Sequence, residues 1–143
     1  MKKFTMTLMA IFIGFAVLSQ HLEAQIFMQN TTMGPQTGYG IYLKNDKGLG
    51  LGWVQQTNQW FESESLSNKH SFIGIGTLIP IQDCGKLSLM LTPKIGLVNG
   101  QFLAILPEAS TTYQLFRNVR LGLGAGIRAR KSAVSFSVSY QPF

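Results

Sequence analysis

The chain is poor in charge and has almost no cysteine. Only 13% of its 143 residues are Asp, Glu, Lys or Arg, whereas 45% are hydrophobic; about a quarter charged is usual in a soluble domain. The single cysteine, Cys84, excludes an internal disulfide and, between Asp83 and Gly85, is predicted to be a turn residue. In place of charge the chain has 15 glycines. The length predicts one domain, and the shortage of charge argues against an ordinary soluble surface.

The N-terminal segment has the pattern of a secretory signal peptide. A basic start is followed by an uncharged, largely apolar run from Met6 to Leu18 and then by the small residue Ala24. The run is shorter than the roughly 20 residues that a membrane anchor helix requires, although a retained anchor is the alternative. We predict that residues 1–24 are removed and that residues 25–143 form one domain.

The net charge is positive, +6 for the whole chain. On a soluble surface, clustered basic residues would suggest a nucleic-acid partner. The export signal argues against that class of partner, and we predict no binding of nucleic acid. Basic residues are instead expected to meet lipid phosphates or acidic groups inside a barrel.

Alternation of apolar with polar or small residues runs through most of the remaining chain. Such a period of two predicts β-strands with one apolar face. Asn99-Gly100 is a strong hairpin signal, and Pro107 marks a bulge or an edge within its strand. Only the first candidate strand, Ile26–Met33, lacks a clean apolar face. The eight candidates are 26–33, 38–45, 49–56, 72–79, 86–98, 102–116, 119–130 and 134–141.

The distribution of charge between the two faces indicates which face is inside. From Tyr39 to Tyr140 the apolar face carries no charge, although a charged side chain facing lipid would cost about 2–4 kcal/mol at the membrane midplane. We therefore predict an all-β fold: a closed antiparallel up-and-down transmembrane β-barrel of about eight strands, after a cleaved signal peptide. A secreted soluble β-barrel binding protein is the alternative. The opposite, inward face holds Lys44, Lys94, Glu108, Arg120, Arg128 and Arg130.

The longest polar segment, Thr57–Lys69, has no periodicity and is predicted to be a loop. With both termini in the periplasm this loop falls on the outer side, where long loops are typical of such barrels. Its Trp60, Phe61, Glu62 and Glu64 are possible contact residues.

The export signal, the amphipathic strands and the terminal strand ending in Phe143 resemble the small eight-stranded OmpA/OmpX-like outer-membrane β-barrels of the porin-type superfamily. The resemblance implies the bacterial outer membrane, contact with its lipid, and recognition of Phe143 by the barrel-assembly machinery. Pro142, just before Phe143, departs from the usual pattern. A barrel of eight strands has an interior filled by side chains. We expect a monomer with a structural or binding role and no cofactor.

Residues that pair across a hairpin point to the same face of the sheet. This rule, here called facing parity, predicts that Val98 pairs with Phe102 and Leu115 with Val119, and it predicts one group of charges inside the barrel. Glu108 then lies opposite Gly126 and diagonal to Lys94 and Arg128. The hypothesis is a lumen ion cluster of Lys94, Glu108, Arg128 and Arg120. The alternative is that Glu108 lies in an exposed loop after the proline that precedes it.

A lipid-modifying outer-membrane enzyme, such as a lipid A deacylase, would need a histidine and a serine beside an acid. After the signal the sequence has one histidine, His70, and its neighbour Ser71 points to the opposite face of a strand. His70 is expected to be a surface or interface residue. We predict no catalytic residues, and we find no pair of groups with ordinary metal-ligand spacing.

Four aromatic residues on the apolar face, Tyr39, Trp53, Tyr113 and Tyr140, are candidates for a membrane-interface girdle. Ordinary lipid-facing packing is the alternative for each of them.

Overall fold

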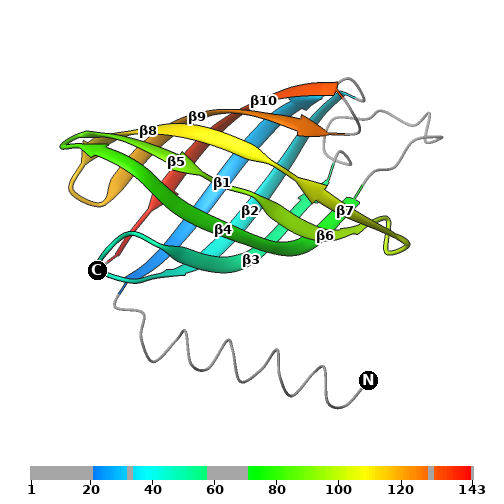
Figure 1. Ribbon diagram of the computed structural model, residues 1–143, viewed down its shortest axis with the longest axis horizontal. Coiled ribbons are helices and arrows are strands. Elements are labelled where there is room, and N and C mark those ends of the chain that lie inside the picture. Colours follow the sequence, from blue (N-terminus) through cyan, green and yellow to red (C-terminus); the bar gives the residue numbers. More distant parts are fainter. Residues whose placement is uncertain (1–20, 32–33, 58–70, 129–130, 143) are drawn as a thin grey trace, which may run out of the picture.

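The computed structural model describes residues 21–31, 34–57, 71–128 and 131–142. Strands that follow one another around the wall pair antiparallel, and β1 pairs with β10, so that the sheet closes on itself (Figure 1). Within these ranges no helix is long and apolar enough to cross a membrane. The strands are β1 (His21–Thr31), β2 (Gly34–Lys44), β3 (Gly50–Thr57), β4 (Ser71–Cys84), β5 (Leu87–Leu91), β6 (Lys94–Val98), β7 (Phe102–Leu106), β8 (Glu108–Phe116), β9 (Val119–Arg128) and β10 (Lys131–Tyr140).

These ten segments occupy eight positions in the wall. β4 pairs with both β5 and β6, which are two halves of one strand interrupted at Pro93. β8 pairs with β5 and β7 pairs with β6, and Pro107 separates β7 from β8. Proline has no N–H to donate to the ladder, but its carbonyl still accepts: Thr77 N–H donates to Pro93 O (2.9 Å) and Ile127 N–H to Pro107 O (3.1 Å). The predicted eight-stranded closed barrel is confirmed.

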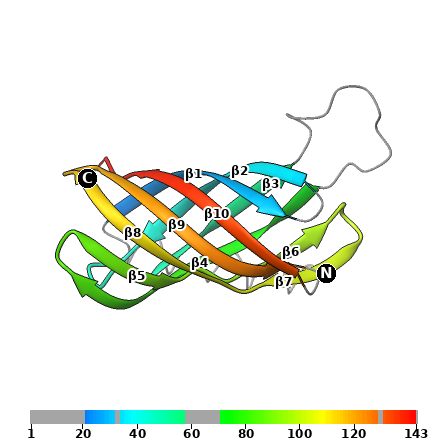
Figure 2. The same cartoon turned by 90° about the horizontal axis from the view of Figure 1, so that it is seen from above.

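The register fixes the tilt of the strands and the width of the barrel. A path that steps from each residue to its paired partner on the next strand, once around the wall, leaves β4 at Ile73 and returns to β4 at Cys84. One residue between these two, Ile81, is the extra residue of a β-bulge and is not counted. The stagger is therefore ten residues for eight strands, which corresponds to a strand tilt of about 40–45°. The tilt is visible in both views (Figures 1 and 2). A barrel of this size has room inside only for side chains.

The apolar face points outward, as predicted. Leu123 and Phe136 are 63% and 43% exposed, whereas the serines on either side of Phe136, Ser135 and Ser137, are 4% and 7% exposed. Large apolar side chains are exposed on all ten strands. Large continuous apolar surfaces mark sites of contact with a membrane or another protein, which agrees with the predicted lipid environment.

Two turns differ from the sequence-based expectation. β4 does not end at Ile79 but continues to Cys84, because the bulge shifts the register and ends the simple alternation. Phe116, not Leu115, pairs with Val119, because Leu115 is itself an extra residue in the wall. By contrast, the Asn99-Gly100 turn pairs Val98 with Phe102 as expected, and Asn99 and Gly100 have φ of 52° and 70°.

β1 begins earlier than expected, at His21. It therefore includes the four residues before the predicted cleavage point, and the weak candidate strand 26–33 is its second part. Leu22 pairs with Leu43, and Ala24 pairs with Ile41 on one side and Tyr140 on the other. The position of cleavage stays a prediction and is taken up below.

The outward apolar face generates a stability prediction. Leu123→Arg, in the middle of β9, should destabilise the barrel by about 2–4 kcal/mol, because the charge would face the hydrocarbon midplane. Leu103→Arg, beside the β6–β7 turn, is the matched control and should cost about 0–1 kcal/mol. The measurement is the free energy of unfolding in lipid vesicles from a urea titration. Equal small losses at both positions would contradict a lipid-facing wall.

Candidate functional site

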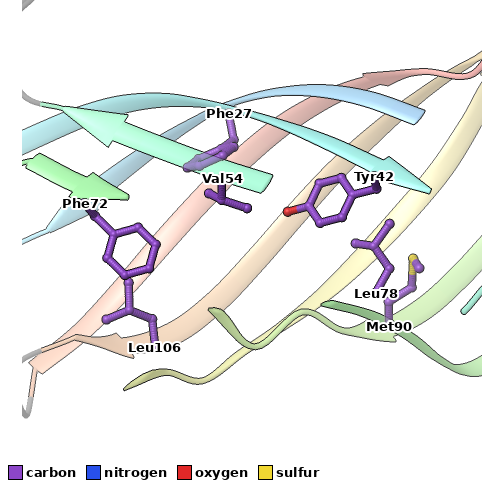
Figure 3. Packing of buried hydrophobic residues seen from close by; sticks show 7 residues of the cluster. All are labelled: Phe27, Tyr42, Val54, Phe72, Leu78, Met90 and Leu106. Carbon is purple, nitrogen blue, oxygen red and sulfur yellow. The ribbon is translucent and has the colours of Figure 1, made fainter. Parts of the chain in front are cut away.

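Buried side chains fill much of the lumen in the described part of the barrel, and some of them are apolar. Figure 3 shows the buried side chains, with the Tyr42 ring directed toward Val54 and Leu78. An inward face of polar and small residues alone, as the alternation predicted, is therefore incomplete. Larger apolar side chains from several strands also point inward: Phe27, Tyr42, Val54, Phe72, Leu78, Met90 and Leu106.

Glycines on β2, β3 and β4 make room for the Tyr42 ring. A Cβ atom at Gly40 or Gly52 would lie 2.6 Å from a ring carbon of Tyr42, and a Cβ atom at Gly76 would lie 2.8 Å from its hydroxyl oxygen. Real Cβ contacts are not this short. These three glycines therefore leave the space that one large aromatic ring needs inside a narrow barrel.

A buried ion pair joins two wall strands near the middle of the lumen. Lys94 Nζ lies 2.9 Å from Glu108 Oε2, and the two side chains are 5% and 8% exposed. The Ser135 hydroxyl donates to the other carboxylate oxygen, Oε1, at 2.6 Å. The Lys94 ammonium also lies 4.3 Å from the centroid of the Phe27 ring, a cation–π geometry. Both charged groups therefore have partners supplied by the barrel itself.

The sequence positions this group through facing parity and through glycine. Glu108 pairs with Gly126, as predicted. A Cβ atom at Gly124 would lie 2.6 Å from the carboxylate oxygen of Glu108, and one at Gly126 would lie 3.2 Å from its Cβ. Glycine at both positions leaves space for the carboxylate between β9 and the lumen centre.

A second buried ion pair lies nearer the end of the barrel that holds both described chain ends, here called the termini end. Lys44 Nζ lies 2.7 Å from Glu23 Oε2, and the side chains are 5% and 7% exposed. Sequence reasoning missed this pair because it assigned Glu23 to the signal peptide. The signal that could have found it is Lys44, a cation on the lumen face without an assigned acid.

A layer of amides lies toward the opposite end, here called the loop end. Gln56 Nε2 donates to Gln29 Oε1 at 2.8 Å and to Gln36 Oε1 at 2.9 Å, and all three side chains are buried. Because Glu23, Phe27 and Gln29 follow one another along β1, the two ion pairs and the amide layer are stacked along the barrel axis. Nothing in the sequence pattern singled out these glutamines.

Comparison with known proteins gives structural matches only. No family model matches the chain, and neither does any curated protein sequence. A de novo designed transmembrane β-barrel superposes with a TM-score of 0.71 at 13% identity, over 86% of this chain and 96% of the other. A second design, TMB2.3, gives 0.64 at 13% identity, over 86% and 94%. The Yersinia pestis outer membrane protein Ail, in a phospholipid bilayer nanodisc, gives 0.58 at 9% identity, over 85% and 98%.

The fold is that of the small outer-membrane β-barrels. At these identities the likeness concerns the fold alone.

Of the other two charges predicted for the lumen cluster, Arg120 lies away from the Lys94–Glu108 pair. Arg120 lies on the barrel's inner face between Gln114 and Ser139. It is six residues along β9 from Gly126, or roughly 20 Å at strand geometry, and it lines a hollow at the termini end together with Lys44. Arg128 is the last residue of β9, and the structure describes its backbone but not its side chain.

The four candidate girdle aromatics all point outward from the barrel and are about half exposed. Tyr113 and Tyr140 lie close to the turn between β8 and β9, at the termini end. Trp53 and Tyr39 lie further along the wall, and the Tyr39 hydroxyl donates to Gln55 Oε1 at 2.6 Å. An outward-facing hydroxyl thereby has a hydrogen-bond partner within the barrel wall.

Several predicted residues lie outside the described ranges, so their positions in the barrel are not stated. Ser71, next to His70, is described: its N–H donates to Asn99 Oδ1 at 2.8 Å and ties β4 to the β6–β7 turn. Cys84 is the last residue of β4 and is exposed at the termini end. Those outside the described ranges are Trp60, Phe61, Glu62, Glu64, His70 and Phe143.

The central ion pair generates a test with a single and a double variant. Lys94→Met should destabilise the barrel by about 3–5 kcal/mol, because it leaves Glu108 buried and unpaired. Adding Glu108→Gln should recover much of that loss. Lys86→Met, at an exposed turn position, is the control and should change stability by less than about 0.5 kcal/mol. Unfolding in urea measures all four proteins; a loss at Lys94 no larger than at Lys86 would refute a dry, paired centre.

Proposed function

We propose that this chain is a bacterial outer-membrane barrel with a structural or binding role and without catalytic activity. The observation that carries the proposal is the combination of a lipid-compatible exterior with a lumen crossed by paired charges. Lys94 on β6, Glu108 on β8 and Ser135 on β10 interact across the interior, over the ring of Phe27 on β1. Groups that are engaged in this way fill the cross-section of the barrel and leave little room for solutes.

The proposed orientation places the termini end in the periplasm. The connections there are short, namely 45–49, 85–86 and 117–118, and short periplasmic turns are typical of such barrels. The long connection between β3 and β4, residues 58–70, leaves the wall at the loop end, where Thr57 pairs with Ser71. We propose this connection as the contact surface of a monomeric barrel that is inserted by the barrel-assembly machinery and surrounded by outer-membrane lipid.

A filled lumen predicts the absence of a channel. The refolded protein should give no discrete conductance steps in a planar lipid bilayer, because the side chains leave no continuous water path. Gel migration before and after boiling, on the same vesicles, checks that the barrel is folded. The triple variant Phe27→Ala, Lys94→Ala, Glu108→Ala removes the central filling and should raise conductance wherever it folds. Regular single-channel steps from the unaltered protein would refute a plugged barrel.

The orientation predicts which thiols a reagent outside the cell can reach. In intact cells a membrane-impermeant maleimide should label Glu62→Cys but should not label Cys84, which is exposed at the termini end. Permeabilising the outer membrane should make Cys84 reactive, so the native cysteine serves as the internal control. Replacing residues 58–70 by a short glycine-containing turn should leave the heat-dependent gel shift intact. Labelling of Cys84 in intact cells would reverse the proposed orientation.

A further inference from the structure

The length of β1 bears on where the signal peptide is removed. A strand that crosses the membrane at a steep tilt needs about 9–11 residues, and β1 has 11. Removal of residues 1–24 would leave only Gln25–Thr31, seven residues of that strand. The mature chain would then begin partway through the wall, with its new ammonium group between β2 and β10.

The partner strands also depend on the residues before that point. Leu22 pairs with Leu43, and Ala24 joins Ile41 of β2 to Tyr140 of β10. Ile41 and Tyr140 are outward-facing side chains in the apolar belt. Without residues 21–24 the adjoining backbone N–H and C=O groups would face lipid, which offers them no hydrogen-bond partner.

A buried charge gives a third, independent reason. Glu23 is the ion-pair partner of Lys44 at 2.7 Å, and both side chains are more than nine-tenths buried. A buried ammonium group requires a compensating charge. Loss of Glu23 with the signal would remove the carboxylate that compensates Lys44.

We propose that signal peptidase cuts upstream of His21, so that Glu23 stays in the mature barrel and closes the termini end with Lys44. The nearest small residue upstream is Ser19, preceded at two positions by Val17, and small residues are what the peptidase reads. In this step water adds across the Ser19–Gln20 peptide bond, leaving a carboxylate on Ser19 and an amino group on Gln20. The inference concerns processing and does not depend on the proposed role of the outer loop.

Intact-mass spectrometry tests the position of cleavage directly. The full chain is produced with its own N-terminus and no tag in a Gram-negative bacterium and is purified from the outer membrane. The expected mass is that of a chain starting at Gln20. A chain starting at Gln25, or an uncleaved chain starting at Met1, overturns the proposal.

Two matched substitutions separate the alternative cleavage points. Ser19→Leu should cause the precursor to accumulate, because it removes the small residue at the proposed cut. Ala24→Leu should be processed like the unaltered chain and keep the substitution in the mature mass, since Ala24 is an exposed position of β1 that accepts an apolar side chain. The opposite pattern overturns the proposal.

A charge exchange asks whether residue 23 acts in the mature barrel. Glu23→Gln should lower the temperature at which the gel band shifts to its unfolded position. Glu23→Lys combined with Lys44→Glu should restore part of that loss. If residue 23 is removed during export, Glu23→Gln leaves the shift temperature unchanged, and the proposal fails.

Discussion

Hydrogen bonding of the backbone in lipid is the constraint on which this structure depends. Hydrocarbon offers no partner to an exposed N–H or C=O group, so the sheet must close. Closure occurs between β1 and β10, where seven residue pairs run from Ala24↔Tyr140 to Asn30↔Val134. Once eight wall strands close with a stagger of ten, the tilt and the lumen width follow. The identity of the inward side chains is then limited by volume.

That volume limit explains the contrast between the two faces of each strand. Outward side chains have no packed neighbours across the wall and can vary in size, whereas large inward side chains such as Tyr42 need small neighbours. Tyr42 occupies the space left by Gly40, Gly52 and Gly76, and the Glu108 carboxylate occupies the space left beside Gly124. Glycine, usually unfavourable in a strand, is therefore the residue that permits a filled interior. The same filling brings oppositely charged groups within contact distance and keeps water from them.

The sequence predicted the features that depend on period two. The pairing of Glu108 with Gly126 follows from facing parity. The outward position of Leu123 and Phe136 follows from the alternation together with the absence of charge on that face. The bulges at Ile81 and Leu115 could not be predicted, because an extra residue is a local backbone event that the alternation does not encode.

The lumen contacts that the sequence did not reveal have a different physical origin. Glu23 lies between the apolar run and Ala24, so it was assigned to the signal peptide. For that reason it was not considered as part of a strand. The amide contact from Gln56 to Gln29 joins strands that are not adjacent in the wall. Such contacts depend on how the closed barrel brings inward side chains from different strands together, which a pattern along one strand does not contain.

Pro93 and Pro107 interrupt the wall, and each directly precedes a residue of the central ion pair in the lumen. Pro93 cannot donate to β4, and Pro107 cannot donate to β9, so the ladder lacks a hydrogen bond on each side of the β5–β8 region. The residues that follow them are Lys94 and Glu108, which form the central ion pair. Thr92 N–H donates to Glu108 O at 2.8 Å and keeps the two broken strands together at this level. The barrel thus places the central ion pair beside the two proline interruptions of its backbone ladder, where the pair joins β6 to β8 across the interior.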